Sequence, residues 1–225
     1  AFIPGLLAII TTFIIKEKPH TATIQYKEQQ PGLFSFAHYW KKSPAEYKKL
    51  VIGLLGFALF NSSDVFLLLK AKEITQSDTI TIGAYIFYNL VYAASSYPLG
   101  SLGDKIGLKK VFIAGLVLFT VVYAGFAFAT SSIAVFALFL VYGLYAAATE
   151  GITKAWITNI ANPSQTATAI GFYTSFQSIC TLVASLLAGL LWTYTGSKTT
   201  FIFSSVLTII IVLFLTTVKE KRQPV

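Results

Sequence analysis

The chain has 225 residues, of which 55% are hydrophobic and 12% are charged, and its formal net charge at pH 7 is +8. A mean hydropathy of +0.70 excludes an ordinary soluble domain and predicts a multi-pass integral membrane protein. The positive charge does not indicate nucleic-acid binding, because the basic residues are not interleaved with a stacking surface in any nucleic-acid motif.

Long apolar stretches predict the domain organisation, because a spanning helix needs about 20 mainly apolar residues. Residues 1–15 are too short for a complete span, and we expect the end of a preceding transmembrane helix there. The chain contains no methionine, which favours a fragment of a longer protein. Residues 16–49 are expected to form a linker, residues 50–218 a six-helix transmembrane bundle, and residues 219–225 a tail. The six spans are expected near residues 50–69, 80–102, 110–129, 133–155, 166–193 and 200–218.

Lysine placement predicts the orientation, because loops rich in basic residues stay on the cytoplasmic side of a membrane. Basic residues gather in the linker, in the 103–110 loop and after residue 218. We therefore expect the linker and the C-terminus to be cytoplasmic and to meet anionic lipid. Cys180 is the only cysteine, and His20 and His38 both fall in the linker, so we expect no membrane-embedded metal site and no cofactor.

Two short motifs predict helix starts. Ser43, Pro44 and Glu46 form a capping pattern, with a side-chain cap followed by proline at the first helical position. Asn162 and Pro163 repeat this pattern before the fifth span.

Asp64 is the most unusual residue of the first span, because an ionisable group in hydrocarbon costs about 2.5 to 3.5 kcal/mol. Counting along a helix places it in the outer half of the span. Three-residue spacing predicts that Asn61 shares its helical face. Asp64 either binds a proton or a cationic substrate, or belongs to a polar cluster that holds helices together.

Glu150 and Lys154 are four residues apart near the cytoplasmic end of the fourth span. This spacing predicts a helical ion pair that fixes or gates helix packing, with direct ion coupling as the alternative. Gly143, Ala147 and Gly151 form a stripe of small residues that favours close helix contact.

Polar side chains also recur at helical spacing on the second and fifth spans, where they either line a pathway or join helices through hydrogen bonds. The side chains expected to line a substrate cavity are Asn61, Tyr85, Asn89, Tyr92 and Gln177.

A glycine-rich segment, GSLGDKIGLKK over residues 100–110, follows the second span. Gly107 suits the left-handed conformation that ends a helix. Asp104 lies at the C-terminal end of its own helix, where it opposes the helix dipole by about 0.3 to 1 kcal/mol. We therefore expect its partner on another helix, or among the lysines of the segment. The lysines can instead meet lipid phosphate.

This segment resembles the signature of the major facilitator superfamily, although Leu108 replaces the usual basic residue. The resemblance implies an all-α membrane protein whose six-transmembrane-helix bundle is the C-terminal half of a twelve-helix fold. It also implies a central cytoplasmic linker over 16–49 and a partner in the missing N-terminal half. The resemblance makes the segment a cytoplasmic gate motif comprising Gly100, Gly103, Asp104, Lys105, Gly107, Lys109 and Lys110.

Two further segments, NSSDVFLLLKA from residue 61 and YGLYAAATEGITKA from residue 142, are similar to a prokaryotic, drug-exporter-like branch of this family. The resemblance implies a secondary active transporter of a small organic solute that works by alternating access in a bacterial inner (plasma) membrane. We expect a proton-coupled exporter, so that Asp64, Glu150 and Lys154 are the candidates for proton or ion coupling. A proton-coupled importer is the alternative, and a membrane receptor or enzyme is a remote one.

Overall fold

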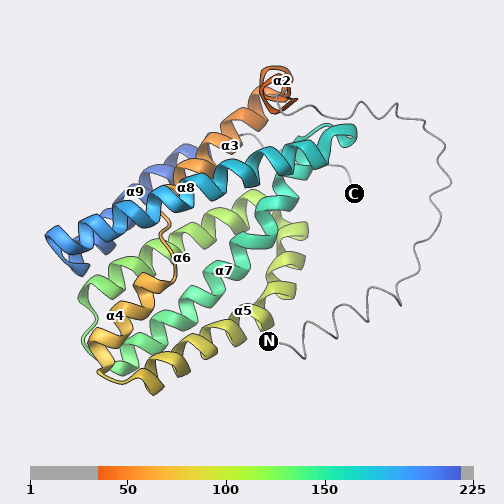
Figure 1. Cartoon of the computed structure of the whole chain (residues 1–225). Helices are drawn as coiled ribbons and strands as arrows, with labels where there is room; N and C mark the ends of the chain where they lie inside the picture. Colours follow the sequence, from red (N-terminus) through yellow and green to blue (C-terminus); the bar gives the residue numbers. More distant parts are fainter. Residues whose placement is uncertain (1–34, 219–225) are drawn as a thin grey trace, which may run out of the picture. The chain divides into compact units, whose positions relative to one another are not determined.

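The computed structural model describes residues 35–218, and these residues form helices joined by short connections (Figure 1). The helix end expected over residues 1–15, the linker up to residue 34 and the tail over 219–225 lie outside the described residues. The described helices are α2 (Ser35–Lys42), α3 (Ala45–Ala58), α4 (Val65–Thr75), α5 (Asp78–Ile106), α6 (Leu108–Phe128), α7 (Ser132–Ile160), the 3-10 helix η1 (Pro163–Gln165), α8 (Thr166–Thr195) and α9 (Ser197–Thr216).

Polar caps begin several helices. The side chains of Ser77 and Ser131 accept backbone N–H bonds at the starts of α5 and α7, and Asn162 does the same for η1, as its motif predicts. The predicted cap at Ser43 is wrong. Its hydroxyl donates instead to the carbonyl oxygen of Tyr39 at 2.6 Å, and α3 begins two residues later without a side-chain cap.

Four of the described helices are long and apolar enough to cross a membrane, namely α6, α7, α8 with η1, and α9. With 29 residues, α5 is also long enough, at about 1.5 Å per residue, but the polar side chains along it make it less apolar. Large apolar side chains on the outer faces of α5, α8 and α9 are exposed, including Leu90, Leu182 and Leu213. These faces suit contact with lipid.

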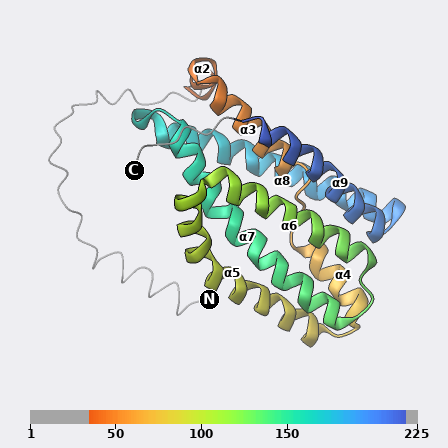
Figure 2. The same ribbon diagram turned by 180° about the vertical axis from the view of Figure 1, so that it is seen from behind.

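Helix α7 is central to the contacts between helices. It packs against α5 and α6, and α6 packs in turn against α9 (Figures 1 and 2). Aromatic rings fill these contacts. The ring of Phe119 stacks on Tyr123 with centroids 3.9 Å apart, and it meets Tyr145 of α7 at 5.0 Å. Such large, stiff side chains fix how the helices pack.

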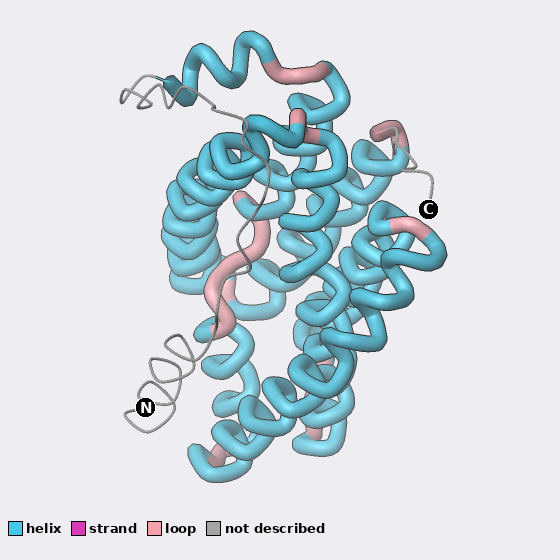
Figure 3. Tube along the Cα trace, turned by 90° about the vertical axis from the view of Figure 1, so that its right-hand side faces the viewer, coloured by secondary structure: helices cyan, strands magenta, loops and turns pink. Residues whose placement is uncertain are grey.

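The first expected span is not one continuous helix. Helix α3 ends at Ala58, residues 59–64 leave the helical path, and α4 begins at Val65. Figures 1 and 3 show this connection as a loop that lies beside neighbouring helices, partway along their length. The prediction of a helix over 50–69 is wrong because the run Asn-Ser-Ser-Asp favours turns over a helical ladder. The predicted shared helical face of Asn61 and Asp64, and the depth counted for Asp64, fail with it.

Gly143 allows α5 and α7 to approach closely. A Cβ atom on Gly143 would lie 2.9 Å from the carbonyl oxygen of Tyr88 and 2.8 Å from Cγ1 of Val91. Ala147 is buried on the same stripe, but a Cβ on Gly151 would meet nothing within 4 Å. The predicted contact of small residues therefore forms at Gly143, and the two helices lie farther apart at Gly151.

We expect Gly143→Ala to destabilise the protein by about 1 to 3 kcal/mol, because a backbone oxygen of α5 cannot move aside for the new methyl group. Thermal unfolding in detergent measures the change. Gly83→Ala on α5 is the matched control, since a Cβ there would meet nothing within 4 Å. Equal destabilisation by both substitutions would contradict the close contact.

Candidate functional site

The glycine-rich segment over residues 100–110 is mostly helical. Helix α5 continues through Gly100, Gly103 and Asp104, and only Gly107 separates it from α6. Gly107 has a φ of 103°, as a glycine helix stop predicts, and its N–H donates to the carbonyl oxygen of Gly103 at 2.9 Å. The segment is therefore a sharp corner between two helices.

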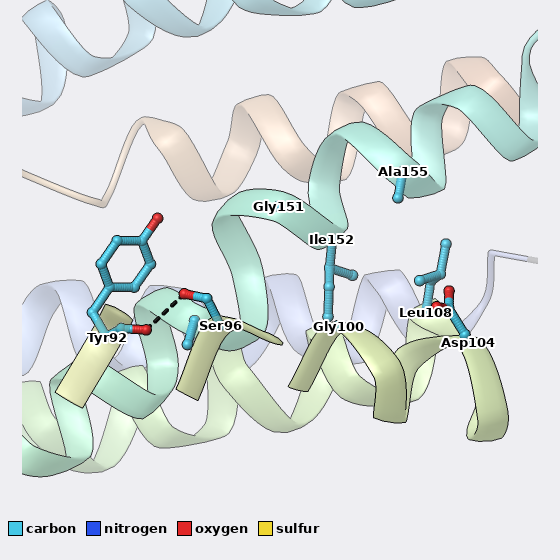
Figure 4. A pocket seen from close by; sticks show the side chains of 9 residues that line it. Tyr92, Ser96, Gly100, Asp104, Leu108, Gly151, Ile152 and Ala155 are labelled. Carbon is cyan, nitrogen blue, oxygen red and sulfur yellow. Dashed lines mark hydrogen bonds between the residues drawn. The ribbon is translucent and has the colours of Figure 1, made fainter. Parts of the chain in front are cut away.

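A groove of about 220 Å³ lies between α5 and α7, here called the α5–α7 groove. Figure 4 shows Tyr92, Ser96, Gly100 and Asp104 along it at four-residue intervals on α5. A Cβ on Gly100, or on Gly151 across the groove, would meet nothing within 4 Å. Asp104 is exposed, and it forms no hydrogen bond or ion pair with any residue that the structure describes. The dipole of α5 is thus opposed by a carboxylate that has no partner in this part of the chain.

Lys109 binds the end of α9. Its Nζ donates to the carbonyl oxygens of Thr216 and Val218, at 2.6 and 2.5 Å. The last carbonyl groups of a helix carry partial negative charge, so an ammonium group stabilises them. This contact joins the start of α6 to the end of α9. Lys105 and Lys110 are exposed, as lipid contact requires.

Glu150 does not form the predicted ion pair with Lys154, which is exposed. The hydroxyl of Tyr92 donates instead to Oε2 of Glu150 at 2.6 Å, which joins α5 to α7. A bond of this kind to a carboxylate is short and strong, whereas an exposed helical ion pair contributes only about 0.2 to 0.5 kcal/mol. The ion-pair prediction is wrong because it considered α7 alone.

Asp64 is held at the break between α3 and α4. The hydroxyl of Tyr142 donates to Oδ1 of Asp64 at 2.6 Å. Nδ2 of Asn61 donates to the hydroxyl oxygen of Tyr145 at 3.1 Å. The two tyrosine rings lie 5.2 Å apart, and both tyrosines are buried. The polar residues of the break therefore bind one face of α7, on which these tyrosines are three residues apart.

A cavity of about 120 Å³, here called the polar cavity, lies among α3, α7 and α8. Asn61, Glu150 and Gln177 line it, although the three lie far apart in the sequence. The hydroxyl groups around them belong to Tyr145, Thr149, Thr153, Tyr173 and Thr181. This lining provides hydrogen-bond donors and acceptors next to one carboxylate.

The side chains predicted to line a substrate cavity do not converge on one place. Asn61 and Gln177 line the polar cavity, whereas Tyr92 lines the α5–α7 groove. Tyr85 and Asn89 line neither of these two cavities. Asn89 is exposed, and its Nδ2 donates to the carbonyl oxygen of Tyr85 on the same helix at 2.8 Å.

Sequence reasoning missed the part that α7 has in the site. Tyr142, Tyr145 and Thr149 follow one another at intervals of three and four residues, which places them on one helical face. A half-buried carboxylate such as that of Asp64 needs donors nearby, and a search for phenol groups at helical spacing would have found this face.

Comparison with known proteins finds relatives of the chain. A family model described as Major Facilitator Superfamily matches residues 65–225. An uncharacterized MFS-type transporter from Methanocaldococcus jannaschii is 34% identical over 216 residues, which cover 93% of this chain and 52% of the relative. The MFS-type transporter ppzB from Metarhizium rileyi is 30% identical over 125 residues, which cover 56% of this chain and 24% of the relative. The chain thus spans about half the length of its archaeal relative.

Lys109→Met should loosen the last turn of α9, because the substitution removes the charge that binds the terminal carbonyl groups, a loss of about 1 to 2 kcal/mol. Hydrogen exchange followed by mass spectrometry should show faster exchange in peptides that cover the end of α9. Lys110→Met removes an exposed charge and should leave this exchange unchanged. The same acceleration in both variants would mean that general charge, and not the helix-end contact, protects α9.

Proposed function

The chain belongs to the major facilitator superfamily, and from this premise we propose that it forms one half of a secondary active transporter. The family and the long apolar helices indicate a multi-pass integral membrane protein and a transporter rather than an enzyme. In this proposal the complete transporter holds a second six-helix half. The two halves rock about a central site and move a small organic solute by alternating access.

The observation that carries the proposal is the bond between Asp64 and Tyr142, each of which is three residues along the chain from a residue that lines the polar cavity, Asn61 or Tyr145. A carboxylate within a spanning segment is costly, and such residues usually belong to ion or substrate pathways. Irregular backbone at membrane depth is tolerated where it lines a cavity or is buried in protein. Asn61 satisfies the first condition, since it lines the polar cavity, and it is also bound to Tyr145. A change in the charge of Asp64 can therefore affect the polar cavity through the bond of Asp64 to Tyr142 and the bond of Asn61 to Tyr145.

We assign proton coupling to Asp64, with Glu150 as a second titratable group at the cavity. Export is favoured by the similarity of the break and of α7 to a drug-exporter-like branch. The alternative is an importer. In an importer the carboxylate of Asp64 would carry the same proton, but the solute and the proton would move in the same direction. Lys154 would take part only if it reached Glu150 in another state of the cycle.

The α5–α7 groove and Asp104 form the cytoplasmic gate in this proposal. The groove is open at Gly100 and Gly151, and its carboxylate has no partner in the described part of the chain. A helix N-terminus or a basic side chain from the second half would fill the open groove and pair with the carboxylate of Asp104. Lys109 ties α6 to α9, so the two helices would move together when the gate opens.

We place the protein in a plasma membrane, the inner membrane if the cell is bacterial, with the gate end in the cytoplasm. The lysine-rich start of α3 is bonded to the start of α8 through Tyr47, whose hydroxyl donates to the carbonyl oxygen of Ala169 at 2.9 Å. The contact of Lys109 with the end of α9 likewise joins two lysine-rich segments. Both contacts agree with an orientation in which these segments face the cytoplasm.

Asp64→Asn should lower proton-coupled flux by at least about tenfold, because the amide cannot bind and release a proton. The assay uses the complete transporter in proteoliposomes and follows internal pH while a candidate solute is added. Asp78→Asn is the matched control, since Asp78 is exposed and pairs with Lys72 at the start of α5. Normal proton-coupled flux in Asp64→Asn would remove this residue from the coupling role.

Asp104→Asn should change how fast the polar cavity is exposed to the cytoplasm, by about threefold to tenfold, because one gate contact stabilises the closed state by about 1 kcal/mol. The rate is measured as maleimide labelling of Gln177→Cys in a Cys180→Ser background. Asp78→Asn should not alter this rate. Identical labelling in all three proteins would count against a gate at Asp104.

A further inference from the structure

The break between α3 and α4 leaves several oxygen atoms without partners. Oδ1 of Asn61 is buried without a hydrogen-bond partner among the described residues, and the hydroxyls of Ser62 and Tyr123 are buried beside one another without a well-formed hydrogen bond. Ser62 is 5% exposed and Tyr123 is 1% exposed. The carbonyl groups of residues 60–62 likewise accept no hydrogen bond from the described residues. Buried oxygen atoms are nearly always satisfied, so this set is expected to bind a cation or ordered water.

The carboxylate of Asp64 lies close to these oxygen atoms, since Asp64 follows Asn61 and Ser62 in the chain and lies near Tyr123. The titratable groups that face Asp64 are tyrosines, namely Tyr88 from α5, Tyr123 from α6, and Tyr142 and Tyr145 from α7. Phenol groups are neutral near pH 7. No lysine, arginine or histidine of the described chain pairs with Asp64. Glu150 is the other carboxylate near Tyr88 and Tyr145, and it accepts the hydroxyl of Tyr92. One positive charge at the break would therefore balance Asp64.

The helix ends on either side favour this arrangement of charges. Helix α3 ends at the break, and the C-terminal end of a helix favours a cation. Asp64 lies directly before α4, where the N-terminal end of that helix favours a carboxylate. Broken membrane helices bind Na⁺ in this way in transporters, through unwound carbonyl groups and helix C-termini.

We propose that the break between α3 and α4 is a binding site for one alkali cation, Na⁺ in the first place, formed by Asp64, Asn61, Ser62 and Tyr123. The ligands are neutral oxygen atoms and one carboxylate, which suit a hard cation of single charge. The site shares Asp64 with the proposed coupling role and rests on that proposal only in this respect. Na⁺ and the proton then compete for the same carboxylate, and binding can be measured without transport.

The test is thermal unfolding of the complete protein in detergent, with NaCl exchanged for choline chloride at constant ionic strength. A ligand that binds only the folded state raises the unfolding temperature in a saturable way. We expect this rise with Na⁺, and a half-saturating Na⁺ concentration that increases as pH falls. Direct binding of ²²Na⁺ to the purified protein should give the same affinity.

Two neighbouring serines provide a matched pair of variants. The hydroxyl of Ser63 already accepts a hydrogen bond from the N–H of Val65 at 3.4 Å, whereas Oγ of Ser62 is buried beside the hydroxyl of Tyr123 without a well-formed hydrogen bond. Ser62→Ala should raise the half-saturating Na⁺ concentration by about tenfold, since one ligand is lost, and Ser63→Ala should leave it near the wild-type value. Asp64→Asn should abolish the Na⁺ response.

The proposal is overturned if choline and Na⁺ stabilise the protein equally, which would mean that ordered water satisfies these oxygen atoms. It is also overturned if Ser62→Ala and Ser63→Ala respond alike, or if Asp64→Asn keeps the full response. If the proposed transport function is wrong but the cation site is right, the experiments give a different result. In that case Na⁺ still binds, but no solute flux accompanies either ion.

Discussion

Polar groups buried at membrane depth need hydrogen-bond partners, and the broken first span makes this constraint severe. The break frees backbone groups and places Asp64 among buried side chains. Helix α7 supplies partners for Asp64 and for Nδ2 of Asn61 through Tyr142 and Tyr145. It can do so because Gly143 brings it against α5 and because aromatic rings hold it against α6. The position of α7 thus determines the geometry of both the break and the polar cavity.

The proposed gate and the polar cavity share helix α7 and are joined by one hydrogen bond. Tyr92 lines the α5–α7 groove, and its hydroxyl binds Glu150, which lines the polar cavity. A shift of α5 at Asp104 would therefore act on the cavity through one hydrogen bond. Lys109 holds the start of α6 to the end of α9, so a movement at the gate end also reaches a helix on the other side of α6.

Sequence reasoning succeeded where one helix decides the outcome. It predicted the helix stop at Gly107 and the cap at Asn162, since both depend on neighbouring residues. It also singled out Asn61 and Gln177, which prove to line one cavity. It failed at the α3–α4 break, where a local polar run overrides the apolar pattern. It also failed at Glu150, whose partner lies 58 residues away on α5, because periodicity along one helix carries no information on contacts between helices.

If Asp64 couples transport to protons, as we propose, it must change its protonation state while it is bound to Tyr142. Infrared difference spectroscopy of the protein in lipid, recorded between acidic and alkaline pH, tests this claim most directly. The account predicts a protonated-carboxyl band that disappears in Asp64→Asn and shifts in Tyr142→Phe, because the phenol bond is lost. A spectrum that both substitutions leave unchanged would show that Asp64 does not titrate, and would contradict the account.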